Sequence, residues 1–351
     1  MLTAARGQTD AHARRLHLLA SFGSPKDPAS AARVLAALVG DSLDDLAQPA
    51  SGGTLQRWRT LSEVASFDLS VAKLFESHTD ALAILKELGD CAGFPRGSTC
   101  GVWAAEVPDA RVIVSRGIGT HVTLTGRKAW CSGAAHLSHA LMTVWCADGT
   151  GPFLAKVHLQ QEGVRVSREG WNAVGMAATA SVDVHFAQAA GTVVGDAEDY
   201  LSRPGFWHGG AGIAACWYGG SVRLAQSLRD AVRLPAGGGS KDFRHAALGK
   251  VDLALKHTAA LLRAAAGWID AHPREDASAL TIRVRMSAED CATQVMHQTA
   301  RALGAVPFCK DEGFARMAAD LPVFIRQSGG ERDACAVGES VAADDNRCWE
   351  L

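Results

Sequence analysis

The sequence lacks an excess of charge of either sign. Its 35 lysines and arginines nearly balance its 37 aspartates and glutamates, which gives a formal net charge of −2. Proteins that bind nucleic acids or anionic membranes usually present a basic patch or a basic net charge. The composition therefore argues against a nucleic acid or a membrane surface as the partner.

Long apolar runs are missing as well. No stretch reaches the roughly 18 consecutive apolar residues of a transmembrane helix, so we expect no membrane span. The only short apolar stretch near the N-terminus, 16–20, is interrupted by His17. It is shorter than the apolar region of a secretory signal peptide. We also find no internal repeat.

Paired cysteine motifs are absent, although the chain has nine cysteines between Cys91 and Cys348. An odd number without any C-x-x-C pair fits neither a disulfide framework nor a zinc site. We therefore expect reduced thiols and a cytoplasmic location. His136 and His139 have a metal-like spacing, but no cysteine or carboxylate cluster accompanies them, so we interpret them as paired loop or strand histidines.

What is present is an ordinary globular composition, with 48% hydrophobic and 21% charged residues. A length of 351 residues allows about two domains at roughly 150 residues each. Between residues 28 and 89 the pattern is helical, and the apolar residues of 67–88 recur mostly at spacings of three and four. Gly89 is a helix-end signal. The glycines and proline that follow mark a first boundary near Gly97.

From about residue 99 to 196 the apolar period becomes two, as in 121–125 and 181–186. Segments 140–146 and 153–159, joined by an Asp-Gly turn, predict a hairpin. Helical periodicity then returns in 210–232, 243–271, 278–304 and 312–327, which predicts a four-helix bundle. The sequence thus predicts an α+β fold with an N-terminal helical domain (1–97), a central antiparallel β-domain (98–198) and a C-terminal four-helix bundle (199–351).

This order of domains resembles the acyl-CoA dehydrogenase superfamily, flavoproteins that hold FAD between the β-domain and the bundle. Three segments carry the resemblance. Residues 124–133, Leu-Thr-Gly-Arg-Lys-Ala-Trp-Cys-Ser-Gly, are similar to the family's central β-motif, and 175–186 are similar to the segment that closes the β-domain. Residues 301–305 and 314–321 are similar to the glycine-rich helix end and the run after it. The resemblance implies a homodimer, a homotetramer or a hetero-oligomer with a paralogue.

The resemblance also implies a cofactor site for FAD. Trp130 would pack beside the isoalloxazine ring, and Ser132 would hydrogen-bond near its N5 and O4 edge. The alternative is that Trp130 is a core aromatic residue at a strand end. Cys131, between them, would line the site as a small buried residue rather than act as a nucleophile. Gly304 and Ala305 stand where the family's Gly-Gly-x-Gly approaches the FAD diphosphate.

The catalytic base is where the sequence departs most from the family. Most members use a glutamate after the last bundle helix to remove the α-proton of an acyl thioester, and Ser328 stands at that position. A neutral hydroxyl cannot act as the base unaided. His208, whose imidazole suits acid–base work near neutral pH, and Glu331 could substitute. Otherwise His208 caps a helix or bonds a loop, and Glu331 is a solvated turn residue.

Further departures weaken the expected cofactor contacts. The family's Thr-Glu-Pro…Gly-Ser-Asp segment is reduced to a remnant in 102–111, and its Arg-x-x-Phe-Gly turn is replaced by 233–243. We expect an FAD-dependent oxidoreductase acting on the CH–CH group of an acyl thioester, with CoA or a carrier as the thiol. Two alternatives remain: a flavin monooxygenase or oxidase on the same fold, which needs no glutamate base, and a catalytically degenerate partner subunit.

Overall fold

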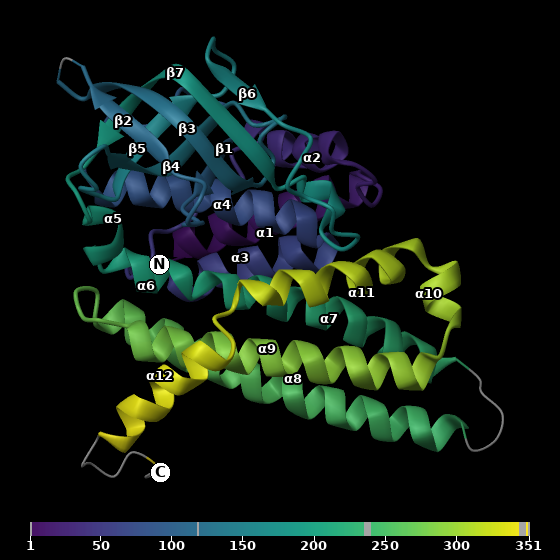
Figure 1. Ribbon diagram of the computed structural model, residues 1–351. Coiled ribbons are helices and arrows are strands. Elements are labelled where there is room, and N and C mark those ends of the chain that lie inside the picture. Colours follow the sequence, from purple (N-terminus) through teal and green to yellow (C-terminus); the bar gives the residue numbers. More distant parts are fainter. Residues whose placement is uncertain (1, 118, 235–239, 344–348, 350–351) are drawn as a thin grey trace. The chain divides into compact units, whose positions relative to one another are not determined.

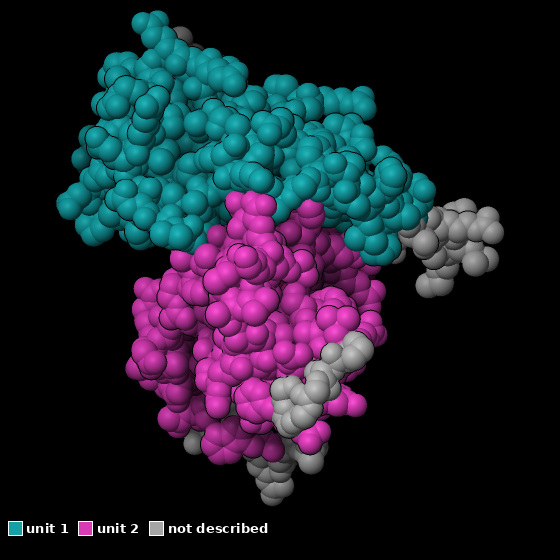
Figure 2. All heavy atoms as spheres, turned by 90° about the vertical axis from the view of Figure 1, so that its right-hand side faces the viewer, with its two compact units in different colours: residues 1–46, 70–206 teal, residues 47–69, 207–351 magenta. Residues whose placement is uncertain are grey.

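The computed structural model describes residues 2–117, 119–234, 240–343 and 349 (Figure 1). The chain combines helices with a sheet and forms two compact units, coloured separately in Figure 2. Unit 1 comprises Met1–Leu46 and Ser70–Phe206, and unit 2 comprises Ala47–Leu69 and Trp207–Leu351. Residues 47–69, which the sequence assigns to the N-terminal domain, are thus grouped with the C-terminal helices.

Unit 1 contains helices α1 (Leu2–Ser21), α2 (Pro28–Gly40) and α4 (Leu69–Glu87) and the short α5 (Asp199–Ser202). Local sequence signals explain where α2 begins. Asp27 accepts a hydrogen bond from the Ser30 backbone, and Ser30 in turn caps Asp27, a capping box completed by Pro28 in the first turn. The predicted helix over 67–88 is confirmed as α4, which begins after the extended residue Asp68.

Among the described residues of unit 1, seven strands form one sheet. They are β1 (Cys100–Trp103), β2 (Val112–Arg116), β3 (His121–Cys131), β4 (His139–Cys146), β5 (Phe153–His158), β6 (Val164–Val166) and β7 (Val182–Val194). The order is β1-β4-β2-β3-β7-β5, with β6 on β7, and an additional β4–β5 pairing closes the ladder on itself. The predicted hairpin over 140–159 is confirmed as β4 and β5.

The sheet is mixed, so the prediction of a purely antiparallel β-domain is wrong at one place. β4 lies between β1 and β2 and is parallel to both. The remaining pairings are antiparallel. Apolar alternation identifies strands and turns but carries no information on which non-consecutive strands become neighbours.

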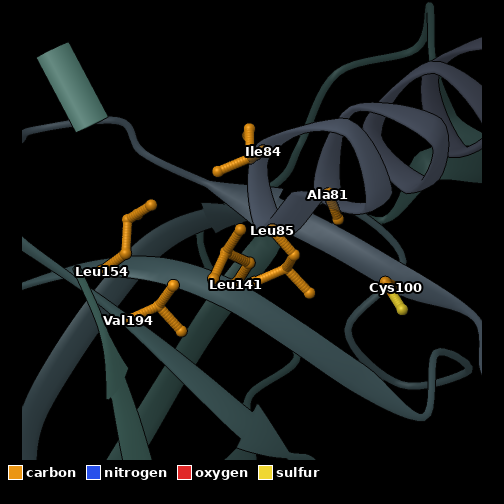
Figure 3. Close-up of a cluster of buried hydrophobic side chains, with 7 residues drawn as sticks. All are labelled: Ala81, Ile84, Leu85, Cys100, Leu141, Leu154 and Val194. Atoms are coloured by element: carbon orange, nitrogen blue, oxygen red, sulfur yellow. The ribbon is translucent and has the colours of Figure 1, made fainter. Parts of the chain in front are cut away.

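Helix α4 supplies the apolar cover of this sheet. Figure 3 shows its side chains directed at those of four strands, in a buried cluster of Ala81, Ile84, Leu85, Cys100, Leu141, Leu154 and Val194. Each of these side chains is at most 5% exposed. Burial of this apolar surface stabilises the unit by roughly 25 cal/mol per Å².

Unit 2 is helical. The four predicted bundle helices are confirmed with small shifts of their ends as α7 (Gly212–Arg233), α8 (Ser240–Ala271), α9 (Ser278–Leu303) and α11 (Glu312–Phe324), continued by the turn η2 (Ile325–Gln327). α3 (Thr54–Phe67) packs against α7 and α8. Shorter helices are α6 (Gly205–Gly210), α10 (Val306–Lys310) and α12 (Glu331–Ala342). The glycine-rich break at 235–239 lies outside the described residues.

Contact between α3 and α7 requires a glycine. A Cβ at Gly219 would lie 2.2 Å from the carbonyl oxygen of Ser62, and the hydroxyl of Ser66 donates to the Gly219 carbonyl oxygen at 2.9 Å. The two helix backbones therefore approach each other more closely than any side chain at residue 219 allows.

No helix among the described residues combines the length and the apolar character needed to cross a membrane.

Candidate functional site

The C-terminal end of β3 contains a β-bulge. Lys128 pairs with Val184, but Cys131 pairs with Val182, so three steps on β3 oppose two on β7. Within the bulge Trp130 has φ +58°, in the left-handed region that is uncommon for a residue other than glycine. Bulges next to binding sites redirect side chains in this way.

The bulge turns Trp130 outward. Its side chain is 56% exposed, whereas Ala129 and Cys131 on either side are buried. The alternative that Trp130 is a core aromatic residue is therefore wrong. Cys131 faces the interior, where its thiol donates a weak hydrogen bond to the Lys128 carbonyl oxygen at 3.3 Å, so a ligand against Trp130 would meet the Cys131 backbone rather than its sulfur. Burial strongly raises the pKa of this thiol, which fits a buried residue rather than a nucleophile.

A chain of three buried hydroxyls begins beside Trp130. The Ser132 and Ser181 hydroxyl oxygens are 2.8 Å apart, and those of Ser181 and Thr179 are 2.9 Å apart. Thr179 donates its hydroxyl proton to the Met176 carbonyl oxygen at 2.8 Å. Since each hydroxyl has one proton, Ser181 donates to Thr179 and Ser132 donates to Ser181. Ser132 Oγ is thus left as an acceptor for any further partner.

Two segments that are far apart in the sequence meet at this point. The predicted closing segment contains the turn η1 (Ala177–Thr179), flanked by Met176 at φ +58° and Ala180 at φ +38°. The Gly133 backbone N–H donates to the Thr179 carbonyl oxygen at 2.7 Å. The structure therefore brings together two of the three segments that carry the sequence resemblance.

The same strand supplies the lysine of an ion pair that is buried at its lysine end alone. Lys128 is fully buried, and its ammonium group donates to Glu106 Oε1 at 2.9 Å and to Thr143 Oγ1 at 2.6 Å. Thr143 donates to the same carboxylate, and Trp145 Nε1 donates to Glu106 Oε2 at 2.9 Å. Glu106 belongs to the 102–111 remnant, and its carboxylate is held by Lys128, Thr143 and Trp145.

Sequence reasoning did not single out Lys128. A signal was available, because the apolar face of β3 runs through Val122 and Leu124, and the same alternation continued through Gly126 places Lys128 on that face.

His208 is placed in α6 of unit 2 and is 1% exposed. Its Nε2 lies 3.2 Å from the Glu275 carbonyl oxygen. Because a carbonyl oxygen only accepts, Nε2 carries the proton and donates it to this loop. The observed bond corresponds to the loop-bonding alternative for His208.

The other two candidate catalytic residues follow α11. Ser328 ends η2, and its hydroxyl accepts from the Gly330 backbone N–H at 3.3 Å. Glu331 is exposed at the first position of α12. Ser328 bonds to Gly330 and His208 bonds to Glu275, while Glu331 is exposed. These bonds do not connect the three candidate residues with one another.

The predicted diphosphate contacts lie at the end of α9. Gly304 follows the last helical residue with φ +64°, and Ala305 directly precedes the five-residue helix α10. A Cβ on Gly304 would meet no atom within 4 Å. The backbone at Gly304 is therefore open on the side where a larger residue would carry its side chain.

Of the two histidines with a metal-like spacing, His136 lies in an exposed turn and His139 in a strand. His139 begins β4, and its ring lies 5.0 Å from that of His158 on β5. Among the described residues, no group of three or more histidine, cysteine, aspartate or glutamate side chains could hold a metal ion.

Comparison with solved structures identifies the fold. KijD3 in complex with FMN and dTDP-3-amino-2,3,6-trideoxy-4-keto-3-methyl-D-glucose matches with a TM-score of 0.76 at 17% identity, over 98% of this chain and 95% of KijD3. Butyryl-CoA dehydrogenase from Megasphaera elsdenii gives 0.78 at 14%, over 95% and 98%. Dibenzothiophene monooxygenase TdsC from Paenibacillus sp. A11-2 gives 0.72 at 17%, over 95% of each chain, and was also solved with FMN and indole.

No family model and no curated protein matches the sequence. Identities of this size establish the fold alone. The chain has an acyl-CoA dehydrogenase-like fold, as the order of its segments predicts.

Proposed function

We propose that this chain is a flavin-dependent oxidoreductase in which the isoalloxazine ring lies against Trp130. The observation that carries the proposal is the pairing of an indole turned outward by a bulge with the hydroxyl chain that begins at Ser132. A planar aromatic ring with a polar edge fits this combination of a flat apolar surface and a neighbouring acceptor. Similar folds were solved with FMN bound.

A bound flavin would supply hydride transfer, which amino-acid side chains do not supply. The residues of the chain would do the rest. Trp130 would cover one face of the ring and exclude water from it. Ser132 Oγ would accept a hydrogen bond from a ring N–H, because the N5 and O4 atoms of an oxidised ring only accept. The hydroxyls of Ser181 and Thr179 would hold Ser132 in this orientation.

For the cofactor we propose FAD, because the backbone is open at Gly304, which together with Ala305 stands where the resemblance implies a contact with the FAD diphosphate. FMN has no diphosphate and would not need this contact. Cofactor released from the purified protein distinguishes the two by its mass.

For the reaction, two candidates remain: dehydrogenation of an acyl thioester, and monooxygenation or oxidation. The residues of the site favour monooxygenation or oxidation. Dehydrogenation of an acyl thioester needs a base at the α-carbon, but Ser328 is neutral and His208 Nε2 donates to a loop carbonyl oxygen. Glu331 is exposed at the start of α12. Monooxygenation or oxidation needs no such base, which favours it for this chain. In both cases the substrate is a small molecule.

The cofactor proposal is tested by titrating the chain with FAD and FMN while recording absorbance near 370 and 450 nm, roughly where oxidised flavins absorb. We expect binding by the native chain and much weaker binding by Trp130→Ala. Trp349→Ala, which removes another exposed tryptophan, serves as the matched control. A chain that binds neither flavin would contradict the proposal and favour a catalytically degenerate partner subunit.

The reaction is tested under anaerobic conditions. Bleaching of the bound flavin by saturated acyl-CoA without added reductant would establish dehydrogenation and remove the monooxygenase candidate. If the flavin instead needs an external reductant and the reduced protein then consumes oxygen, the second candidate is supported.

A further inference from the structure

Three helices of unit 2, labelled α3, α7 and α8 in Figure 1, form a pocket where they meet. Its volume is about 290 Å³. Every lining residue belongs to unit 2, whereas Trp130 and Ser132 belong to unit 1. The pocket therefore shares no lining residue with the candidate flavin site, and what it binds can be argued separately.

The buried part of the lining is apolar and includes an aromatic ring. Each helix contributes one residue to it, Trp58 from α3, Ala215 from α7 and Leu262 from α8, and each is at most 6% exposed. Ala215 and Ala259 extend only a methyl group, so α7 and α8 leave space that larger side chains would fill. Ligand pockets are typically lined in this way, with a few polar groups to orient the ligand.

The polar part of the lining contains three donors without an acceptor, again one from each helix. Arg59 and Arg263 form no hydrogen bond or ion pair with any described residue, and the Tyr218 hydroxyl has no hydrogen-bond partner among them. Both arginines are exposed, and Tyr218 is half-buried. All three donors are therefore available to an acceptor that enters from solvent.

Charge makes that acceptor an anion. The lining has two arginines and one acidic residue, Glu63. A guanidinium group matches the geometry of a carboxylate and can bind it through two parallel hydrogen bonds. Burial raises the pKa of Tyr218, while the nearby Arg263 lowers it in part, so the hydroxyl keeps its proton at neutral pH and can donate to the same anion.

The volume limits the size of the ligand. Pockets for drug-sized molecules range over about 300–1,000 Å³, so this one admits a single small ring system and excludes a dinucleotide or an acyl-CoA. We propose that the pocket binds a small aromatic carboxylate. The ring lies against Trp58 and Leu262, and Arg59, Arg263 and the Tyr218 hydroxyl hold the carboxylate. The inference does not depend on the proposed function.

The test begins with the native full chain and defined probes. Benzoate and 2-naphthoate are the aromatic carboxylates, benzamide and 2-naphthamide are their uncharged counterparts, and acetate is an anion without a ring. Titrations followed by saturation-transfer NMR measure each Kd. At least one aromatic carboxylate should bind with a Kd of about 1 mM or lower, and its amide and acetate should bind about tenfold more weakly or less.

Charge variants then locate the carboxylate. Arg59→Gln and Arg263→Gln should each raise the Kd of the aromatic carboxylate about tenfold, because each removes a charge-assisted hydrogen bond. Tyr218→Phe should raise it by a smaller factor. Arg229→Gln is the matched control, since Arg229 is exposed on α7 outside the lining, and it should leave the Kd unchanged.

A second pair of variants tests the apolar space. Ala259→Leu places a larger side chain in the pocket and should abolish binding. Ala260→Leu makes the same change at the next residue of α8, which is exposed and outside the lining, and should have no effect.

Three results would overturn the inference. The first is that neither aromatic carboxylate binds the native chain. The second is that the amides or acetate bind as tightly as the carboxylates, since the pocket would then not recognise the combination of ring and charge. The third is an unchanged Kd in both Arg59→Gln and Arg263→Gln, or equal binding by Ala259→Leu and Ala260→Leu, because the ligand would then lie elsewhere.

Discussion

Gly133 lies so close to Leu74 that a Cβ at residue 133 would stand 2.7 Å from the leucine Cδ2 atom. This contact joins α4 to the turn that follows Trp130 and Ser132. Gly133 also has φ +72°, a conformation that other residues adopt at a cost.

Gly133→Ala should therefore destabilise the protein by about 1–3 kcal/mol, from strain at positive φ together with displacement of Leu74. Urea unfolding measures the change. Gly149→Ala is the control, since Gly149 has φ +87° with open space around it and so reports the backbone cost alone. Equal losses in the two variants would show that the contact with Leu74 contributes nothing.

Ser181→Ala should cost about 1 kcal/mol, because it removes the middle member of a buried hydroxyl chain. It should also leave Ser132 without its acceptor. We expect an altered absorbance spectrum of bound flavin in this variant, measured against the native complex. Ser51→Ala, on an exposed turn in unit 2, should change neither quantity.

The buried carboxyl group of Glu76 should make the stability of the protein depend on pH. Burial raises the pKa of this carboxyl group, Lys73 at 3.0 Å lowers it in part, and Asp80 raises it again. Between the ordinary value of 4.5 and the raised value, the folded chain holds a proton that the unfolded chain has released. Stability therefore falls as pH rises through this window, and the cost remains above it.

Glu76→Gln should remove that cost. The variant should be more stable than the native chain at pH 8, and the two should converge below pH 4.5. Thermal unfolding at both pH values provides the measurement, with Glu162→Gln on the surface as control. A variant less stable than the native chain at pH 8 would show that the ion pair with Lys73 outweighs burial.

Asp270 at the end of α8 holds the beginning of α3. Its carboxylate accepts from the Gly52 and Thr54 backbone N–H groups at 2.9 and 3.2 Å and from the Thr54 hydroxyl at 2.6 Å. Asp270→Ala leaves these donors without their acceptor and should lower the free energy of unfolding by about 1–3 kcal/mol. Asp252→Ala on the exposed side of the same helix should change it little.

Much of the fold follows from periodicity, because helices and strands that bury one face repeat their apolar residues at 3.6 or 2.0. This is why α7, α8, α9 and the β4–β5 hairpin lie where the sequence predicts them. Periodicity does not report which distant segments meet. The parallel pairing of β4 with β1 and β2, and the grouping of α3 with the C-terminal helices, therefore appear only in the structure.

The candidate site follows the same rule. Trp130 and Ser132 could be singled out because a short motif contains both, and the structure places their neighbours Thr179 and Ser181 from the second motif beside them. The exposure of Trp130 could not be predicted, since alternation along β3 assigns residue 130 to the interior face. Only the unpaired residue in the bulge reverses that assignment.

The pairing of β3 with β7 contains two bulges of opposite sense, one between Leu124 and Gly126 and one between Lys128 and Cys131. From Leu124 to Cys131 on one strand, and from Ala189 to Val182 on the other, the chain advances by the same seven positions. A deletion of one residue from each strand would thus restore continuous pairing without moving the sheet on either side. The bulged segment can therefore be lengthened or shortened by one residue on each strand while the residues on either side of it keep their partners.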